Sequence, residues 1–142
     1  MDPVSLAQIL DEARQRVESV TDPESAADLF ERVLRAASQE QAVLDALRGV
    51  PAGRALLRFT DANAAFEFAA GEGTLSLQRA EKRGPGPKVD AAAATWLGLM
   101  AGTLKPWLAF TRGLVVCRGG LAELRWLQQV AERIQSGYAA AR

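Results

Sequence analysis

Apolar positions change their spacing near residue 50. Between residues 6 and 47 they recur at intervals of three and four, which places them on one face of each amphipathic helix. From Gly53 the interval falls to two, as in strands with one buried face. The pattern therefore predicts N-terminal helices over residues 1–50 and a part that begins with strands over residues 53–142.

Three helices are expected in the first part. The first carries a stripe of apolar residues: Leu6, Ile9, Leu10, Ala13, Val17 and Val20. The second starts in the segment TDPES, where Asp22 can cap the helix and Pro23 suits its first turn. In the segment SQEQ, Ser38 and Gln41 have the spacing of a capping box, which predicts a third helix that Gly49 stops.

Three short runs after Gly53 predict strands joined by hairpin turns. They are Arg54–Thr60, Ala64–Ala70 and Thr74–Ala80, separated by TDAN and GEG. In the second run Phe66 and Phe68 share one face, and Glu67 lies on the other. The polar segment EKRGPGPK that follows reads as a loop within one domain.

The remaining third alternates short helices and strands. The segment VDAAAAT is open between strand and helix, because alanine favours helix. A helix is expected from Trp96 to Gly102, and a second, short one from Pro106 until Gly113 stops it. The apolar segment LVVC reads as a buried strand. The last helix spans residues 121–142, with an apolar stripe of Leu124, Leu127, Val130, Ala131 and Ile134.

Composition narrows the class of protein. The 142 residues suit a single domain, and 17 basic residues balance 17 acidic ones. Such a balance gives no electrostatic reason to expect a nucleic acid or an anionic membrane as the main partner. Apolar runs stay below the roughly 18–20 residues that span a bilayer. With Cys117 as the single cysteine, a cytoplasmic protein is expected.

The chain contains no histidine, which removes whole classes of chemistry. Catalytic triads, histidine general bases and most zinc sites need one. Cys117 has no histidine to activate it and should be an inert buried thiol. Glu67 and Asp90 are explained by outward, solvated positions. An enzyme is therefore the least favoured class, and the sequence predicts no cofactor and no metal.

One stretch, GTLKPWLAFTRGLVVCRGG at residues 102–120, carries a family pattern. It contains a G-x-L-x-P element at Gly102–Pro106, the pair Ala109-Phe110, then Gly113, an apolar strand and a further glycine before a leucine-rich helix. This order resembles the sterol-carrier-protein, or nonspecific lipid-transfer, family. The likeness extends more loosely from Gly53 to Ile134.

The resemblance implies an α+β fold. In that family a twisted, mostly antiparallel five-stranded sheet is covered by helices, and an apolar tunnel between them takes a lipid chain. Gly102 and Gly113 would permit sharp turns there, while Trp107 and Phe110 would fill the space under the sheet. The implied lipid-binding residues are Phe59, Phe66, Phe68, Leu97, Met100, Leu104, Trp107, Phe110, Leu127 and Ile134.

Two interpretations of these residues stay open. They can form an ordinary packed core, or they can leave a void that an acyl, sterol-like or isoprenoid chain fills, at about 0.8 kcal/mol for each methylene removed from water. Small residues at 91–94 leave room for such a chain. The last helix can likewise seal the core or act as a movable lid, with Trp126 resting on a membrane or a partner.

The function expected first is non-enzymatic lipid binding or carriage, with transient membrane contact. The alternative is a protein-interaction module with a closed core that acts through its N-terminal helices, for example as a homodimer. An exposed apolar stripe on Leu6–Val20 would favour this alternative. In bacteria, similar domains are accessory parts of lipid-modifying or quinone-synthesising systems, so the two functions are compatible.

Overall fold

A computed structural model describes residues 6–17, 22–118 and 120–141. The described elements, in chain order, are α1 (Leu6–Val17), α2 (Pro23–Ala37), α3 (Gln41–Ala46), β1 (Gly53–Phe59), β2 (Ala65–Gly71), β3 (Thr74–Arg79), β4 (Lys88–Ala91), α4 (Ala93–Ala101), α5 (Pro106–Thr111), β5 (Val116–Cys117) and α6 (Leu121–Ala140). Val20, assigned to the first apolar stripe, lies outside the described residues.

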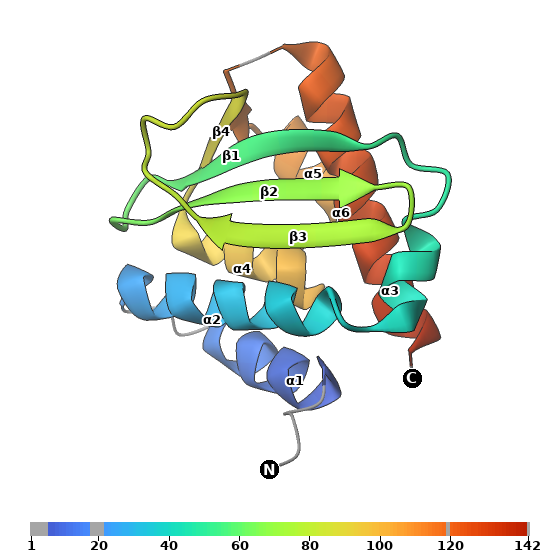
Figure 1. The fold of residues 1–142 in the computed structure, drawn as a ribbon. Helices are drawn as coiled ribbons and strands as arrows, with labels where there is room; N and C mark the ends of the chain where they lie inside the picture. The colour runs from blue at the N-terminus through green and yellow to red at the C-terminus, as the bar shows by residue number, and fades with distance from the viewer. Residues whose placement is uncertain (1–5, 18–21, 119, 142) are drawn as a thin grey trace.

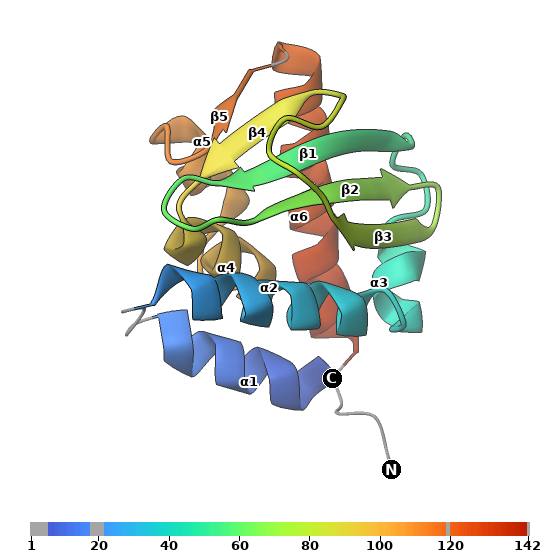
Figure 2. The same ribbon diagram turned by 60° about the vertical axis from the view of Figure 1, so that its left-hand side comes forward.

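The five strands form one mixed sheet in the order β3-β2-β1-β4-β5. Neighbouring strands are antiparallel except for β1 and β4, which run parallel because the loop after β3 carries the chain across to the other side of β1. Helix α6 runs behind the sheet, α4 lies between the sheet and α2, and α1 lies beneath α2 (Figures 1 and 2). The predicted α+β class, with a mostly antiparallel sheet and N-terminal helices, is confirmed.

Local signals placed some helix ends correctly and one wrongly. Asp22 caps α2, and its carboxylate accepts a hydrogen bond from the Glu24 backbone N–H at 3.1 Å, as predicted. The capping box at Ser38 is wrong. Ser38 ends α2 instead, and its hydroxyl donates to the Arg35 carbonyl at 2.7 Å. The reason is that α2 continues to Ala37, so Glu40 takes the N-cap position of α3.

The ambiguous alanine segment divides between two elements. Strand β4 ends at Ala91, and α4 begins at Ala93. The Ala93 N–H donates to the Asp61 carboxylate at 2.9 Å, so a residue of the β1–β2 turn caps this helix from a distance of 32 positions. This hydrogen bond stabilises the start of the helix at Ala93, and it involves a distant residue that alanine propensity does not take into account.

The predicted buried strand LVVC is only partly correct. Strand β5 comprises Val116 and Cys117 alone, and Val116 is 46 % exposed. Val115 is buried, and Cys117 is half-buried. Strand β5 pairs only with β4 and forms an edge of the sheet, so its other side lacks a neighbouring strand.

A cluster of four aromatic rings fills the space between the sheet and two helices. Phe30 of α2, Phe59 of β1, Phe66 of β2 and Trp96 of α4 are all fully buried. Their neighbouring ring centroids lie 5.2–6.3 Å apart, in edge-on or tilted arrangements that aromatic pairs prefer. The Trp96 indole N–H also donates to the Arg58 carbonyl at 3.0 Å. The cluster therefore fixes α2 and α4 to the centre of the sheet.

Asp90 joins three strands and is not the solvated residue that the sequence predicts. Its carboxylate accepts two hydrogen bonds from Arg58 on β1, at 2.6 and 2.9 Å, and one from Arg118, just after β5, at 2.9 Å. Its side chain is 13 % exposed. The hydrogen bond from Arg58 holds the pKa of Asp90 below its usual value, although burial partly opposes this. Pattern alone could not show these partners, because they come from other strands.

Replacing Asp90 should therefore destabilise the sheet in a pH-dependent way. Because the pKa of Asp90 is lowered, its contribution is present above its ordinary value of 3.8 and is lost as the pH falls through the folded pKa. Asp90→Asn should lower the free energy of unfolding by about 2 kcal/mol at pH 7, measured by urea unfolding. The difference from wild type should shrink below pH 3.8.

Glu67→Gln is the matched control. Glu67 is exposed on β2, and its carboxylate lies 3.9 Å from the Arg54 guanidinium. Surface pairs of this kind contribute about 0–1 kcal/mol, so this variant should unfold almost as wild type does. Equal losses in the two variants would contradict the role given to Asp90.

Candidate functional site

The structure brings seven of the ten predicted lipid-binding residues together in one apolar core. Each of the seven is at most 1 % exposed: Phe59, Phe66, Phe68, Leu97, Met100, Leu127 and Ile134. They come from β1, β2, α4 and α6, so one face of the sheet meets these two helices at this place. We call these seven residues the interior set.

Two further predicted residues lie at the margin of the interior set. Leu104 and Phe110 are half-buried and pack against the core. The turn that carries Leu104 is tied to α6, because the Gln135 side-chain amide donates to the carbonyls of Leu99 and Leu104, at 2.9 and 3.0 Å. These bonds hold α4 and the start of α5 against the last helix.

Trp107 does not fill the space under the sheet, so this prediction is wrong. Its side chain is 52 % exposed. Helix α5 is six residues long and turns Pro106 and Ala109 toward the core, which leaves Trp107 on the opposite side. The short helix thus presents an aromatic ring to solvent.

Trp126 is held in place and does not project freely from α6. Its indole N–H donates to the Pro51 carbonyl at 2.8 Å, and its ring lies 6.1 Å from that of Phe68. A Cβ at Gly53 would lie 2.5 Å from the indole, so glycine there makes room for the ring. Trp126 therefore fastens α6 to the start of β1. This contact involves distant residues, which the helical pattern could not indicate.

Exposed apolar side chains gather at one edge of the molecule. Among the described residues, the large apolar side chains that are exposed are Trp107, Leu114, Val116 and Leu121. We call these four residues the apolar edge. They lie on α5, the loop after it, β5 and the start of α6, which follow one another along the chain; Figure 2 shows α5 beside β5, with the start of α6 above β5.

Basic side chains accompany the apolar edge. Lys105, Arg112 and Arg125 are exposed, and none of their side chains forms an ion pair or hydrogen bond with another described residue. Within residues 105–125, Glu123 is the single acidic residue. Only in the neighbouring Arg118 is the charge engaged, by Asp90. The edge therefore combines apolar surface with unpaired positive charge.

Part of the basic loop EKRGPGPK is engaged with the sheet and is not free to contact a ligand or a membrane. The Lys82 ammonium donates to the Phe59 carbonyl at 2.7 Å, and the Lys82 carbonyl accepts from Arg58 at 3.2 Å. Leu56, on the outer face of β1, is buried, and Gly84 of the loop lies close to it. The loop thus packs onto the sheet.

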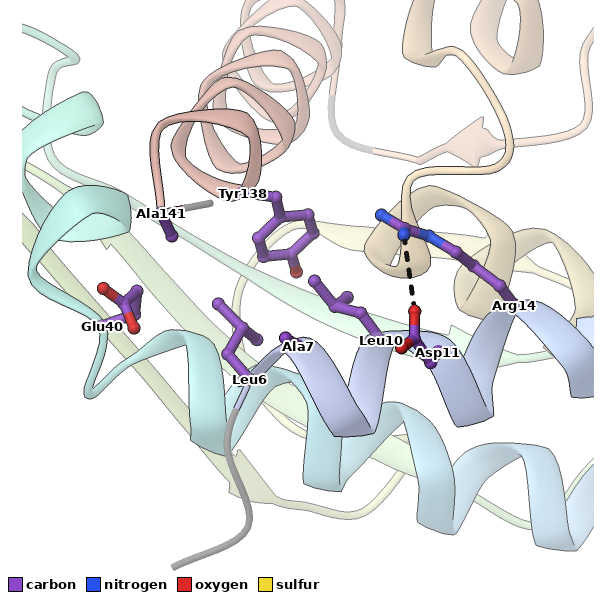
Figure 3. A pocket seen from close by; sticks show the side chains of 8 residues that line it. All are labelled: Leu6, Ala7, Leu10, Asp11, Arg14, Glu40, Tyr138 and Ala141. Atoms are coloured by element: carbon purple, nitrogen blue, oxygen red, sulfur yellow. Dashed lines mark ion pairs between the residues drawn. The ribbon is translucent and has the colours of Figure 1, made fainter.

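A hollow of about 590 Å³ lies away from the interior set, between α1, the start of α3 and the end of α6 (Figure 3). We call it the outer hollow. It is lined by Leu6, Ala7, Leu10, Asp11, Arg14, Glu40, Tyr138 and Ala141. Three further hollows, of about 290, 320 and 470 Å³, lie around the sheet and its loops. All four hollows are lined by residues other than the ten predicted ones.

Tyr138 carries the unusual group of the outer hollow. Its side chain is buried, and its hydroxyl is the one buried side-chain polar atom among the described residues that has no hydrogen-bond partner. Burial raises the pKa of Tyr138, and the nearby Arg14 charge opposes this only in part, so the hydroxyl stays protonated at neutral pH. Sequence reasoning missed Tyr138, although it lies four residues after Ile134 and continues the apolar stripe of the last helix.

The stripe predicted on the first helix is already covered. Leu6, Ile9, Leu10 and Ala13 are buried within the fold, where α1 packs against α2 and α4. Val17 is half-buried against the same core. An exposed apolar stripe on the first helix would have favoured an interaction module, but the described residues of this stripe are buried or half-buried.

The described ranges contain no group of three or more aspartate, glutamate or cysteine side chains placed to hold a metal ion. Within the same ranges, no helix has the length and apolar character that crossing a membrane requires.

Two solved structures are similar to this chain over most of its length. The crystal structure of sterol carrier protein 2 has a TM-score of 0.57 and 20% sequence identity, over 84% of this chain and 97% of its own. The solution structure of a conserved hypothetical protein from Thermus thermophilus, described as a candidate sterol carrier protein, has a TM-score of 0.55 and 20% identity, over 83% of this chain and 87% of its own.

This chain has the sterol carrier protein fold. No protein-family model and no curated protein sequence matches it, so the similarity is one of structure. The sterol carrier protein fold also confirms the resemblance seen in the stretch from Gly102 to Gly120, and extends it to most of the chain.

The sharp turns predicted at Gly102 and Gly113, between α4 and β5, are present in the structure. Gly102 ends α4 with φ +83°, and Gly113 follows α5 with φ +71°; glycine adopts this left-handed region without the strain that side chains impose. Pro106 occupies the first turn of α5. The two turns bring the chain from α4 to β5, at the edge of the sheet.

Proposed function

We propose that this chain is a non-catalytic lipid-binding protein. An acyl, sterol-like or isoprenoid chain would lie between the sheet and helices α4–α6, in contact with the interior set and with Leu104 and Phe110 at its margin. The sterol carrier protein fold supports this proposal, as does the meeting of the interior set in a single apolar region.

The observation that carries the proposal is a gradient of exposure from the apolar edge to the interior set. Trp107 lies at the surface on α5. Leu104 and Phe110, on the same part of the chain, are half-buried against the core. Met100 and Ile134 are fully buried. An entering lipid chain would leave water and gain apolar contacts progressively, first at the surface near Trp107, then at Leu104 and Phe110, and last at Met100 and Ile134.

Entry requires movement, because the interior set is packed. A weak barrier lies at β5, which contributes only two residues to the sheet and is followed by one further backbone bond, from Arg118 N–H to the Lys88 carbonyl at 2.8 Å, and by the exposed Arg118 side chain paired with Asp90. Such bonds are worth about 1 kcal/mol each. Burial of about ten methylenes gains about 8 kcal/mol before the cost of ordering the lipid. The gain is large enough to offset an opening at this edge.

The apolar edge also suits brief contact with a membrane from which a lipid is taken. Trp and Leu side chains insert into the headgroup boundary, and unpaired Lys105, Arg112 and Arg125 would meet anionic phosphates. Each basic residue near such a surface contributes about 1 kcal/mol. The overall charge of the chain is zero, so this local positive charge is what would orient it.

Blocking the interior set tests the proposal directly. Met100→Trp adds volume at a position that is 1 % exposed, so bound lipid and the new ring would compete for the same space. Native mass spectrometry of delipidated protein incubated with palmitate or geranylgeraniol should show a one-to-one adduct for wild type. In Met100→Trp that adduct should fall at least tenfold.

Leu34→Trp is the control for overpacking. Leu34 is equally buried on α2 but is not one of the ten predicted residues. Both variants should lose about 1–3 kcal/mol of stability, and only Met100→Trp should lose the adduct. Wild type that takes up neither lipid, or equal losses in the two variants, would overturn the proposal.

Trp107 offers a separate test of membrane contact. Of the three tryptophans, Trp96 is buried and Trp126 is hydrogen-bonded, so a blue shift of emission on adding vesicles reports mainly on Trp107. We expect the shift with phosphatidylglycerol vesicles, and binding roughly a hundredfold weaker with phosphatidylcholine, because about 3 kcal/mol of charge attraction is lost.

Two charge reversals complete this test. Arg112→Glu should weaken binding to phosphatidylglycerol vesicles, while Arg16→Glu, at the end of α1, should change it little. A blue shift that survives Trp107→Phe, or equal effects of the two reversals, would show that the apolar edge is not the contacting surface.

A further inference from the structure

The wall of the outer hollow contains a hydrogen-bond donor that has no partner among the described residues. The Tyr138 hydroxyl, near the end of α6, points toward α1 and is covered there by the Leu10 side chain (Figure 3). A buried hydroxyl without a partner costs stability, and native proteins keep few of them. An acceptor supplied by a ligand would satisfy this group.

A second set of donors lies at the same end of the hollow. The Nε of Arg14 donates to the Ala101 carbonyl at 3.0 Å, which fixes the position of the guanidinium. Among the described residues, its terminal nitrogens have only a distant ion pair, at 3.9 Å, with the exposed Asp11. Arg14 offers only N–H donors and carries a positive charge, and Tyr138 offers an O–H donor, so an anionic acceptor is the one kind of group that suits both.

The rest of the lining is mainly apolar. Leu6, Ala7 and Leu10 of α1 form one wall, and Ala141 of α6 lies opposite. Glu40 lies at the far end from Arg14 (Figure 3), and Asp11, which also lines the hollow, is exposed and 3.9 Å from the Arg14 guanidinium, so a negative group is favoured only where it contacts Arg14 more closely than Asp11 does. A volume of about 590 Å³ lies within the roughly 300–1,000 Å³ of small-molecule sites.

We propose that the outer hollow binds a single-chain carboxylate, with its oxygens accepting hydrogen bonds from the Tyr138 hydroxyl and the Arg14 guanidinium and its chain lying along Leu6 and Leu10. The head reaches the hydroxyl when the Leu10 side chain, which adjoins it, changes rotamer. None of the lining residues belongs to the proposed lipid site, so this is a second site and does not depend on that proposal.

The test compares decanoate binding to wild type and Tyr138→Phe by isothermal titration. Phenylalanine keeps the ring and removes only the hydroxyl. Two effects of opposite sign are expected: decanoate binds roughly tenfold more weakly, because a hydrogen bond to a charged group is lost, and the ligand-free variant has a higher urea midpoint, because no unpaired hydroxyl is buried. A purely structural role for Tyr138 would not produce this pair of effects.

Two tryptophan variants locate the bound decanoate. Ala7 is exposed and lines the hollow, so Ala7→Trp should fold and abolish binding. Gln15→Trp, also exposed on α1 but outside the lining, should bind as wild type does. Decyltrimethylammonium, with the same chain and a cationic head, should not bind at this site.

The other possible results of the decanoate experiment each support or overturn the proposed carboxylate site. Loss of decanoate binding in Met100→Trp, with Ala7→Trp unaffected, would overturn this inference and support the interior site. Loss in Ala7→Trp alone supports the inference whatever becomes of the interior site. Unchanged affinity in Tyr138→Phe, or no binding of decanoate to wild type, would also overturn the inference.

Discussion

The structure depends on how the space between the sheet and its helices is filled. Phe30, Phe59, Phe66 and Trp96 occupy the centre of that space as interlocked rings, and Trp96 is also hydrogen-bonded to the backbone of β1. Close packing of this kind resists any change of volume. A lipid chain must therefore be taken up beside the aromatic cluster, toward α4, α5 and α6, where side chains pass from fully buried to exposed within a short segment of the chain.

The sheet and its β5 edge are held very differently. Asp90 links β4 to Arg58 on β1 and to Arg118 after β5, so charge holds the inner strands in register. Strand β5 itself adds only two residues, and Val116 on it is half exposed. A firm sheet beside a lightly attached edge suits a protein that admits a ligand without unfolding. The same edge carries unpaired basic side chains, so entry and membrane contact would share one surface.

Sequence patterns predicted features that depend on neighbouring residues. The cap at Asp22, the alternation of Phe66 and Phe68, and the turn at Gly102 follow from local chemistry, and the structure has all three. The spacing of apolar residues also placed the interior set correctly in a core. It could not show whether that core holds a ligand, because a side chain that packs against protein and one that packs against lipid have the same pattern.

Features that depend on distant partners were beyond such patterns. Trp126 has a partner in Pro51, 75 positions away, and Asp90 has one in Arg58, 32 positions away. Trp107 faces solvent because α5 buries its other side. For Tyr138 the helical stripe gives the position, but the missing partner of its hydroxyl is a property of the folded protein alone.

The most direct measurement is of contacts between a bound lipid and methyl groups of the protein. Leucine, isoleucine and methionine methyls would be isotope-labelled, and nuclear Overhauser effects to unlabelled palmitate recorded. Lipid carriage in the interior predicts contacts to Met100, Leu127 and Ile134. Contacts confined to Leu6 and Leu10, or none to any labelled methyl, would contradict it.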